Sequence, residues 1–244
     1  MDRWQPSFDV PDDDAPTRDD GDSPSARFFA HVEATAFPCV GAKAALARGA
    51  IRTVELRAMD EARDAAALLD ALHAFGAFLD AQPADDATVH SLVALYAGPR
   101  RTDEPGFERA LWATLQRLHD LDRARGHAWA GDVSSDPHSP QFSLSLGGHP
   151  FFVIGLHPGA SRLARRLPTP ALVFNSHRQF EALRADGRYQ KMQAATRERD
   201  LALQGSLNPN LADFGSAAEA RQYSGRAVGA GWRCPFHART GGTP

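Results

Sequence analysis

The segment FSLSLGGHPFFVIGL, residues 142–156, constrains the fold of this chain more than any other. Two runs rich in strand-forming residues flank Gly147 and Gly148. A Gly-Gly pair between two such runs is typical of a tight β-hairpin, because glycine adopts the backbone angles that the turn needs. The segment therefore predicts two antiparallel strands.

Helical and strand patterns alternate along the rest of the chain. Helical spacing of apolar residues occurs in five segments: 26–34, 39–49, 61–82, 104–125 and 178–203, the last with a possible break at Gly187. Strand-like runs occupy 50–57, 88–96 and 171–175. Together these elements predict one α/β (α+β) domain, with a mixed sheet of about five strands flanked by helices.

The two ends of the chain have a different composition. Residues 1–25 are rich in Asp, Pro and Ser and have no apolar periodicity, so we expect a disordered acidic tail. We expect residues 239–244 to fray. The predicted catalytic domain, which would bind haem, is 26–238, and the length of its loop-rich part near the C-terminus favours a functional role.

The composition indicates a soluble cytoplasmic protein. The net charge of −3 favours neither nucleic acid nor an anionic membrane as a partner. No apolar run is long enough to span a bilayer, and the N-terminus lacks the pattern of a signal peptide. Two widely separated cysteines do not make a disulfide framework.

The segment 147–166 is a candidate anion site. A predicted strand ends at His157, Pro158-Gly159 turns the chain, and a short basic helix is expected to begin at Ser161. On that helix the arginines would share one face and suit carboxylates or phosphates: Arg162, Arg165 and Arg166. The alternative is a solvated basic helix with no ligand.

Other candidate groups are scattered along the chain. His157 and His177 stand beside a turn or a helix start and are candidate acid–base groups or metal ligands, whereas His149 suits a structural role. Five further histidines look like ordinary helix or loop residues: His73, His90, His119, His127 and His138. Arg221 and Arg226 bracket Tyr223, and Cys234 with His237 gives only a weak zinc signal.

Cys39 follows Phe37-Pro38 at a predicted helix start. The helix dipole lowers the pKa of a thiol in that position and favours the thiolate, which can bind a metal. A single thiolate and several arginines would suit haem, which needs an axial ligand and partners for two propionates. A small buried hydrophobic group is the commoner fate of a free cysteine and stays open as the alternative.

Several segments, taken in order, resemble the YqcI/YcgG family from about Phe37 to Phe236. They are FPCVGAKAAL at 37–46, LHDLD at 118–122, GGHPFFVIGLHPGASRLARR at 147–166, LVFNSH at 172–177 and QYSGR at 222–226. Within the family, the chain is most similar to the branch of haem-dependent pre-guanitoxin N-hydroxylases. A related haem protein of D-cycloserine biosynthesis hydroxylates the guanidine of arginine.

The resemblance implies a haem b enzyme that inserts oxygen into an N–H bond of a small guanidino or amino compound. It makes Cys39 the expected axial ligand of the iron, with His157 as the alternative or as an acid–base group, and His177 as a second catalytic candidate. The expected haem-binding residues also include Tyr223 and five arginines: Arg162, Arg165, Arg166, Arg221 and Arg226.

The resemblance also implies partners. The enzyme would use O2 and an external electron donor or peroxide, and a separate reductase is expected because the chain has no GxGxxG motif. Four acidic residues have the charge to hold a cationic substrate: Glu198, Asp200, Asp213 and Glu219. The alternative functions are a non-catalytic haem carrier or sensor, and a protein that binds an anionic metabolite.

Overall fold

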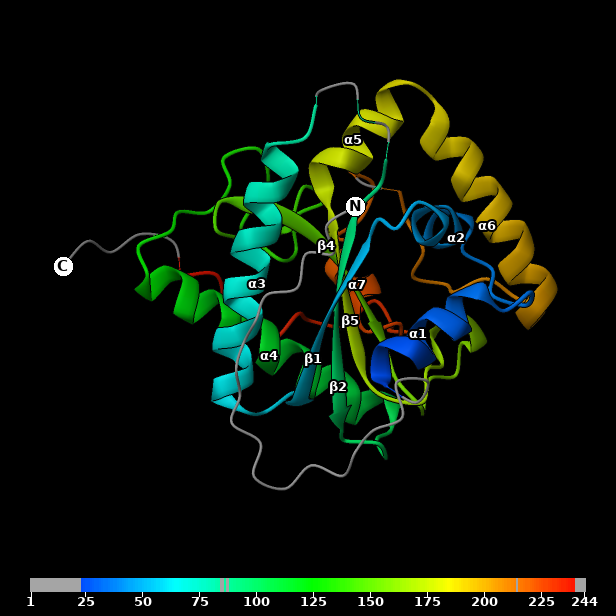
Figure 1. Ribbon diagram of the computed structural model, residues 1–244, viewed down its shortest axis with the longest axis horizontal. Coiled ribbons are helices and arrows are strands. Elements are labelled where there is room, and N and C mark those ends of the chain that lie inside the picture. Colours follow the sequence, from blue (N-terminus) through cyan, green and yellow to red (C-terminus); the bar gives the residue numbers. More distant parts are fainter. Residues whose placement is uncertain (1–22, 84–85, 87, 214, 240–244) are drawn as a thin grey trace.

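The computed structural model describes residues 23–83, 86, 88–213 and 215–239 (Figure 1). A five-stranded mixed sheet lies at the centre, in the order β1-β2-β5-β4-β3. The strands are β1 (Ile51–Ala58), β2 (Ser91–Gly98), β3 (Leu144–Leu146), β4 (His149–Leu156) and β5 (Ala171–Ser176). The first two strands are parallel, and the other neighbours are antiparallel. The predicted fold class is confirmed.

The predicted hairpin is formed by β3 and β4. Gly147 and Gly148 have φ values of 60° and 71°, in the left-handed region that glycine adopts without a steric penalty. The first strand is short and pairs only with the beginning of β4, where Leu144 lies opposite Phe151. Beyond Phe151, β4 is paired with β5 alone. The segment that follows β4 and the short helix α7 (Ala220–Tyr223) contact this part of β4 instead. Arg165 of that segment donates a hydrogen bond to the Gly155 carbonyl.

Two long helices cover one face of the sheet (Figure 1). They are α3 (Ala62–Asp80) and α4 (Glu104–Ala124). Asp103 caps the start of α4, because its side chain accepts a hydrogen bond from the Gly106 amide at 2.7 Å. The apolar stripes of both helices meet the sheet in a fully buried core that includes Leu68, Leu72, Phe75, Leu111, Leu115 and Phe151. Burial of this area from water is the main stabilising contribution on this side.

Shorter helices and a peripheral helix cover the other face (Figure 1). They are α1 (Pro24–Glu33), α2 (Val40–Ala47), α5 (His177–Ala185), α6 (Arg188–Gln204) and the 3-10 turn η2 (Leu163–Arg165). A smaller core joins this layer to the sheet through Phe28, Val32, Val93 and Leu95. Side chains of β2 alternate between the two faces, because Leu92 and Ala94 belong to the larger core.

Several sequence-based predictions need correction here. The helix expected to begin at Ser161 is only the three-residue turn η2, so its arginines do not share a helix face. Pro24 and Ser25, assigned to the tail, belong to α1, whose N-cap is Ser23. The prediction for residues 1–22 lies outside the described part of the chain. The break at Gly187 is confirmed, with a φ of 77° between α5 and α6.

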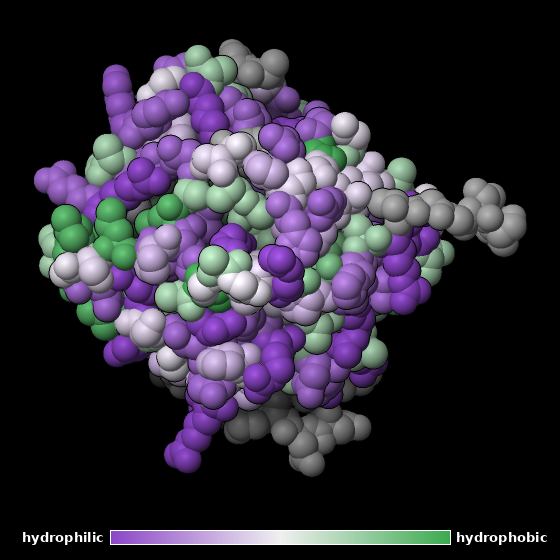
Figure 2. Space-filling view, turned by 180° about the vertical axis from the view of Figure 1, so that it is seen from behind, coloured by the Kyte–Doolittle hydropathy of each residue, from purple (hydrophilic) through white to green (hydrophobic). Residues whose placement is uncertain are grey.

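The surface is largely hydrophilic in the view of Figure 2, with apolar residues gathered toward one side. Of the residues that the structure describes, four have large apolar side chains that are exposed, in η2, α6 and the segment after it: Leu163, Leu201, Leu207 and Leu211. Within the described residues, no helix combines the length and apolar character needed to cross a bilayer.

Candidate functional site

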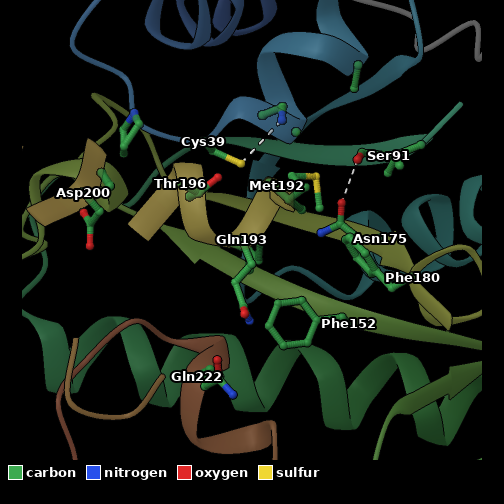
Figure 3. A pocket seen from close by; sticks show the side chains of 18 of the residues that line it. Cys39, Ser91, Phe152, Asn175, Phe180, Met192, Gln193, Thr196, Asp200 and Gln222 are labelled. Carbon is green, nitrogen blue, oxygen red and sulfur yellow. Dashed lines mark hydrogen bonds between the residues drawn. The ribbon is translucent and has the colours of Figure 1, made fainter. Parts of the chain in front are cut away.

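A cavity of about 320 Å³ lies between the sheet and the layer formed by α1, α2, α5 and α6. This volume is in the range of sites that hold small molecules. Most of its wall is apolar, and part of its polar lining is labelled in Figure 3. Two segments far apart in the chain close it: the start of α2, with Cys39, and the inner face of α6, with Met192, Thr196 and Asp200.

Cys39 is the N-cap of α2, and its side chain lines the cavity (Figure 3). Its Sγ accepts a hydrogen bond from the Ala42 amide at 3.4 Å. The amide of Val40, the first residue of α2, donates a hydrogen bond to the Thr196 hydroxyl of α6 at 3.3 Å. The Thr196 contact joins α2 to α6 one residue from the thiol.

The expected lowering of the Cys39 pKa is wrong for the protein without a ligand. Burial raises the pKa of the thiol, although the Ala42 amide and the nearby Arg165 guanidinium both oppose that rise. The physical reason is that the free-energy cost of removing a thiolate from water is larger than the stabilisation that one helix N-terminus and one cation give it. Cys39 is therefore a thiol at neutral pH, and a bound metal ion would favour its ionised form.

Arg165 is a half-buried cation that lines the same cavity. Its guanidinium donates hydrogen bonds to three main-chain carbonyls, those of Gly155, Gln222 and Tyr223. No carboxylate of the described residues lies within ion-pair distance of it, and burial lowers its pKa to about 10. The site thus contains a positive charge that is hydrogen-bonded but has no carboxylate counterion in contact.

A second arginine, Arg162, is paired. Its Nη2 lies 2.6 Å from Oδ2 of Asp200, and both side chains are nearly buried. The other oxygen of Asp200, Oδ1, is buried and has no hydrogen-bond partner among the described residues. A buried acceptor without a donor is costly. Asp200 therefore presents an oxygen suited to a donor on a ligand.

Asn175, near the end of β5, presents the opposite group. Its Oδ1 accepts a hydrogen bond from the Ser91 hydroxyl at 2.7 Å (Figure 3). This bond fixes the amide, and its Nδ2 is buried with no partner among the described residues. The cavity lining therefore contains an unpaired donor as well as an unpaired acceptor.

Glu219, the residue before the short helix α7 (Ala220–Tyr223), is a buried carboxyl on the cavity lining. Burial raises its pKa to about 8, against the effect of its contact with Tyr223. Its Oε1 lies 2.5 Å from the Tyr223 hydroxyl, which is also 3.2 Å from the Phe151 carbonyl. At neutral pH Glu219 is mostly protonated, so it can donate a hydrogen bond or release a proton in the cavity.

The structure brings together part of the predicted set of site residues. Cys39, His177, Arg162 and Arg165 line the cavity. His177 is buried, and burial lowers its pKa, so the imidazole is neutral at pH 7 and can accept a proton. Of the four acidic candidates, Asp200 and Glu219 line the cavity, whereas Glu198 and Asp213 do not.

The remaining predicted residues lie elsewhere. His157 is stacked on Phe107 of α4, with ring centroids 4.2 Å apart, and is outside the cavity lining. Arg166 binds the Ala160 carbonyl. Arg221 donates to main-chain carbonyls, and Arg226 is paired with Glu108.

Three further predictions concern His149, Tyr223, and Cys234 with His237. His149 is structural as expected, with its Nε2 2.9 Å from the Ser176 hydroxyl. Tyr223 is buried behind Glu219, outside the lining itself. Among the described residues, Cys234 and His237 are not joined by a third potential ligand.

Sequence reasoning missed the residues that only the fold brings to the cavity. Met192, Gln193 and Thr196 follow helical spacing along α6 with the predicted Asp200, and this spacing was a usable signal. Asn175 was visible as a polar residue near the end of an apolar strand, and Ser91 gave no signal.

The comparisons with known proteins give a family and no close relative. A family model described as the YqcI/YcgG family matches residues 28–237, which include every cavity residue discussed above. No curated protein and no solved structure matches the chain significantly.

Proposed function

The chain belongs to the YqcI/YcgG family, and from this premise we propose that it is a haem-dependent N-oxygenase acting on a small guanidino or amino compound. The observation that carries the proposal is that Cys39 and Arg165 both line the cavity, close enough for the guanidinium to act electrostatically on the thiol. A thiol that can ligate iron and a cation without a carboxylate partner are the two groups that a haem with anionic propionates requires.

The residues present fit haem. Cys39 would hold the iron, and Arg165 would bind a propionate with less loss of side-chain entropy than a free arginine, because three carbonyls already order it. The largely apolar wall suits the macrocycle. When bound through a thiolate, haem supplies activation of O2, with electrons from an external donor such as a separate reductase, or activation of peroxide.

The cavity's acidic groups suit a cationic or weakly basic substrate. The unpaired Oδ1 of Asp200 can accept a hydrogen bond from a guanidinium or amine N–H, and a charged acceptor strengthens that bond. Neutral His177 can accept a proton, and Glu219 can hold one, since the pKa of Glu219 is raised to about 8. Asp200 would position the reacting nitrogen of the substrate, and His177 and Glu219 would accept or donate its protons.

The experiment that tests the proposal is an absorption spectrum of the full chain after haem is added, in the ferric, ferrous and ferrous–CO states. We expect the long-wavelength ferrous–CO band of thiolate ligation in the wild type, and its loss in Cys39→Ser, which keeps a helix N-cap. The matched control is Cys234→Ser, because Cys234 is buried outside the cavity lining and should leave the band unchanged.

Turnover completes the test. With a reductant and O2, the wild type should convert a guanidino or amino compound to its N-hydroxy product, and Cys39→Ser should not. A histidine-type band would remove Cys39 from the iron and contradict the assignment. A protein that takes up no haem would overturn the function and leave Arg165 as the anchor for a different anionic ligand.

A further inference from the structure

Three potential metal ligands meet where the middle of α3 faces the end of α4, on the face of the sheet opposite the cavity. His73 belongs to α3, Asp122 to the last turn of α4, and His127 to the loop that follows. One ligand atom from each of them lies within 4.8 Å of the others. None of the three lines the cavity. Among the described residues, no second group of His, Cys, Asp and Glu is arranged in this way.

The distances place both imidazoles on one carboxylate oxygen. His73 Nε2 lies 2.6 Å from Asp122 Oδ1, and His127 Nδ1 lies 3.1 Å from the same atom. The two rings are inclined by 61°, with centroids 4.3 Å apart. Ligand atoms around a tetrahedral zinc ion, with bonds of about 2.0–2.1 Å, are separated by roughly 3.3 Å, so modest expansion of this trio would admit an ion.

The carboxylate is held by a second set of contacts. The Gly147 amide, in the β3–β4 turn, donates to both oxygens of Asp122 at 3.1 and 3.0 Å. The side chain of Asp122 is 3% exposed. The main chain at Gly147 has a φ of 60° and packs against the His73 ring, where an added Cβ would lie 2.8 Å from Cδ2. Such outer contacts orient the ligands of metal sites.

His127 indicates that hydrogen bonding alone does not complete the cluster. Its Nδ1 is buried, but the geometry toward Asp122 does not make a hydrogen bond, and this nitrogen has no such partner among the described residues. The imidazoles remain accessible, with side-chain exposures of 22% for His73 and 40% for His127. The cluster therefore lies next to solvent, although the ligating nitrogen of His127 is buried.

We propose that His73, Asp122 and His127 form a binding site for a divalent transition metal ion of the Zn²⁺ class. Two imidazole nitrogens and one carboxylate oxygen are a ligand set of zinc and its neighbours in the first transition row. Ca²⁺ and Mg²⁺ prefer oxygen ligands alone. The bound ion would join α3, the loop after α4 and, through Gly147, the hairpin turn. The site is separate from the cavity and does not depend on its proposed function.

Titration calorimetry of the full chain with Zn²⁺ tests the site, together with Co²⁺ absorption as a report of ligand type. We expect about one equivalent to bind. His73→Ala and His127→Ala should each weaken binding at least tenfold, since even loss of an outer-shell contact costs about 10–100-fold. His127→Ala alters only a half-exposed loop side chain, so it guards against misfolding of the helix variant.

Two controls separate this site from other sources of metal binding. His90→Ala removes an imidazole that pairs with a single carboxylate, Asp86, and should leave the affinity unchanged. Cys39→Ser should also leave it unchanged, and the Co²⁺ spectrum should lack a thiolate charge-transfer band. Absence of saturable binding, equal affinity in His73→Ala, or loss of binding only in Cys39→Ser would each overturn the proposal.

Discussion

Helices α3 and α6 are similar in length and lie on opposite faces of the sheet, yet they relate to it in different ways. Of the 19 residues of α3, nine are buried, and of the 17 residues of α6, none is. The inward face of α3 carries Leu68, Leu72 and Phe75, which fill the space against the strands. The inward face of α6 carries Met192, Thr196 and Asp200, which border a cavity.

The difference separates stability from binding. Close packing on the α3 side contributes most of the apolar burial, and the α6 side keeps space and unpaired polar atoms for a ligand. Substitutions at matched positions on the two faces should therefore have unequal effects on the free energy of unfolding.

The largest effect is expected at the centre of the α3 side. Phe75 is fully buried and stacks on Phe151, so Phe75→Ala should lower the free energy of unfolding by about 3–5 kcal/mol through lost burial and the cavity left behind. The counterpart Phe180→Ala, at a half-buried side chain on the cavity wall, should cost less than half as much. Urea denaturation followed by circular dichroism measures both, and equal losses would break the comparison.

The second effect depends on pH and belongs to the cavity side. The pKa of Glu219 is raised by burial from its usual 4.5 to about 8, so its contribution to stability is complete below pH 4.5 and is lost as the pH rises through 8. Between pH 5 and 8 the wild type should lose on the order of 4 kcal/mol relative to Glu219→Gln. Asp213→Asn, at an exposed carboxylate, serves as the control. Parallel pH profiles of the wild type and Glu219→Gln would contradict the assignment.

A smaller loss in the free energy of unfolding is expected at Gly155, where β4 packs closely against α4. A Cβ added at Gly155 would lie 2.6 Å from Cε1 of Phe107 and 2.8 Å from Cδ1 of Leu111. Both neighbours are fully buried, so Gly155→Ala should cost about 1–3 kcal/mol by overpacking. Thermal unfolding of the variant measures it. An unchanged midpoint would show that α4 can shift from the sheet.

The smallest effect is expected at the matched glycine of the cavity side. A Cβ at Gly41 would meet Sδ of Met192 at 2.7 Å, which is the far end of a flexible side chain beside open space. The higher helix propensity of alanine offsets the cost of moving the Met192 side chain, so Gly41→Ala should change the free energy of unfolding by less than about 1 kcal/mol. The same thermal scan tests it, and a loss as large as that of Gly155→Ala would remove the distinction between the faces.

The sequence predicted the local elements well where short-range chemistry decides them. The hairpin followed from Gly147-Gly148, the break before α6 from Gly187, and the helix start at Cys39 from the preceding Pro38. The basic helix expected after Ser161 is wrong, because the Arg165 side chain there donates hydrogen bonds to carbonyls of β4 and α7, which sequence spacing does not show.

The functional groups divide in the same way. The residue type and helix position of Cys39 were readable, but its raised pKa depends on burial by α6, a segment more than 150 residues away. Arg165 is a candidate propionate ligand and Arg166 is not, because Arg165 lines the cavity whereas Arg166 binds the Ala160 carbonyl. His73 and His127 look ordinary in sequence, because Asp122 joins them only when α3 packs against α4.

The sequence by itself determined the five-stranded mixed sheet, its flanking helices and the family of the chain. These depend on the period of apolar residues, on turn chemistry and on motif order, all of which are local or linear. Only the tertiary structure decided which polar side chains share a cavity and which are left unpaired there. The physical reason is that burial and proximity, which set charge state and ligand geometry, are properties of contacts between distant segments.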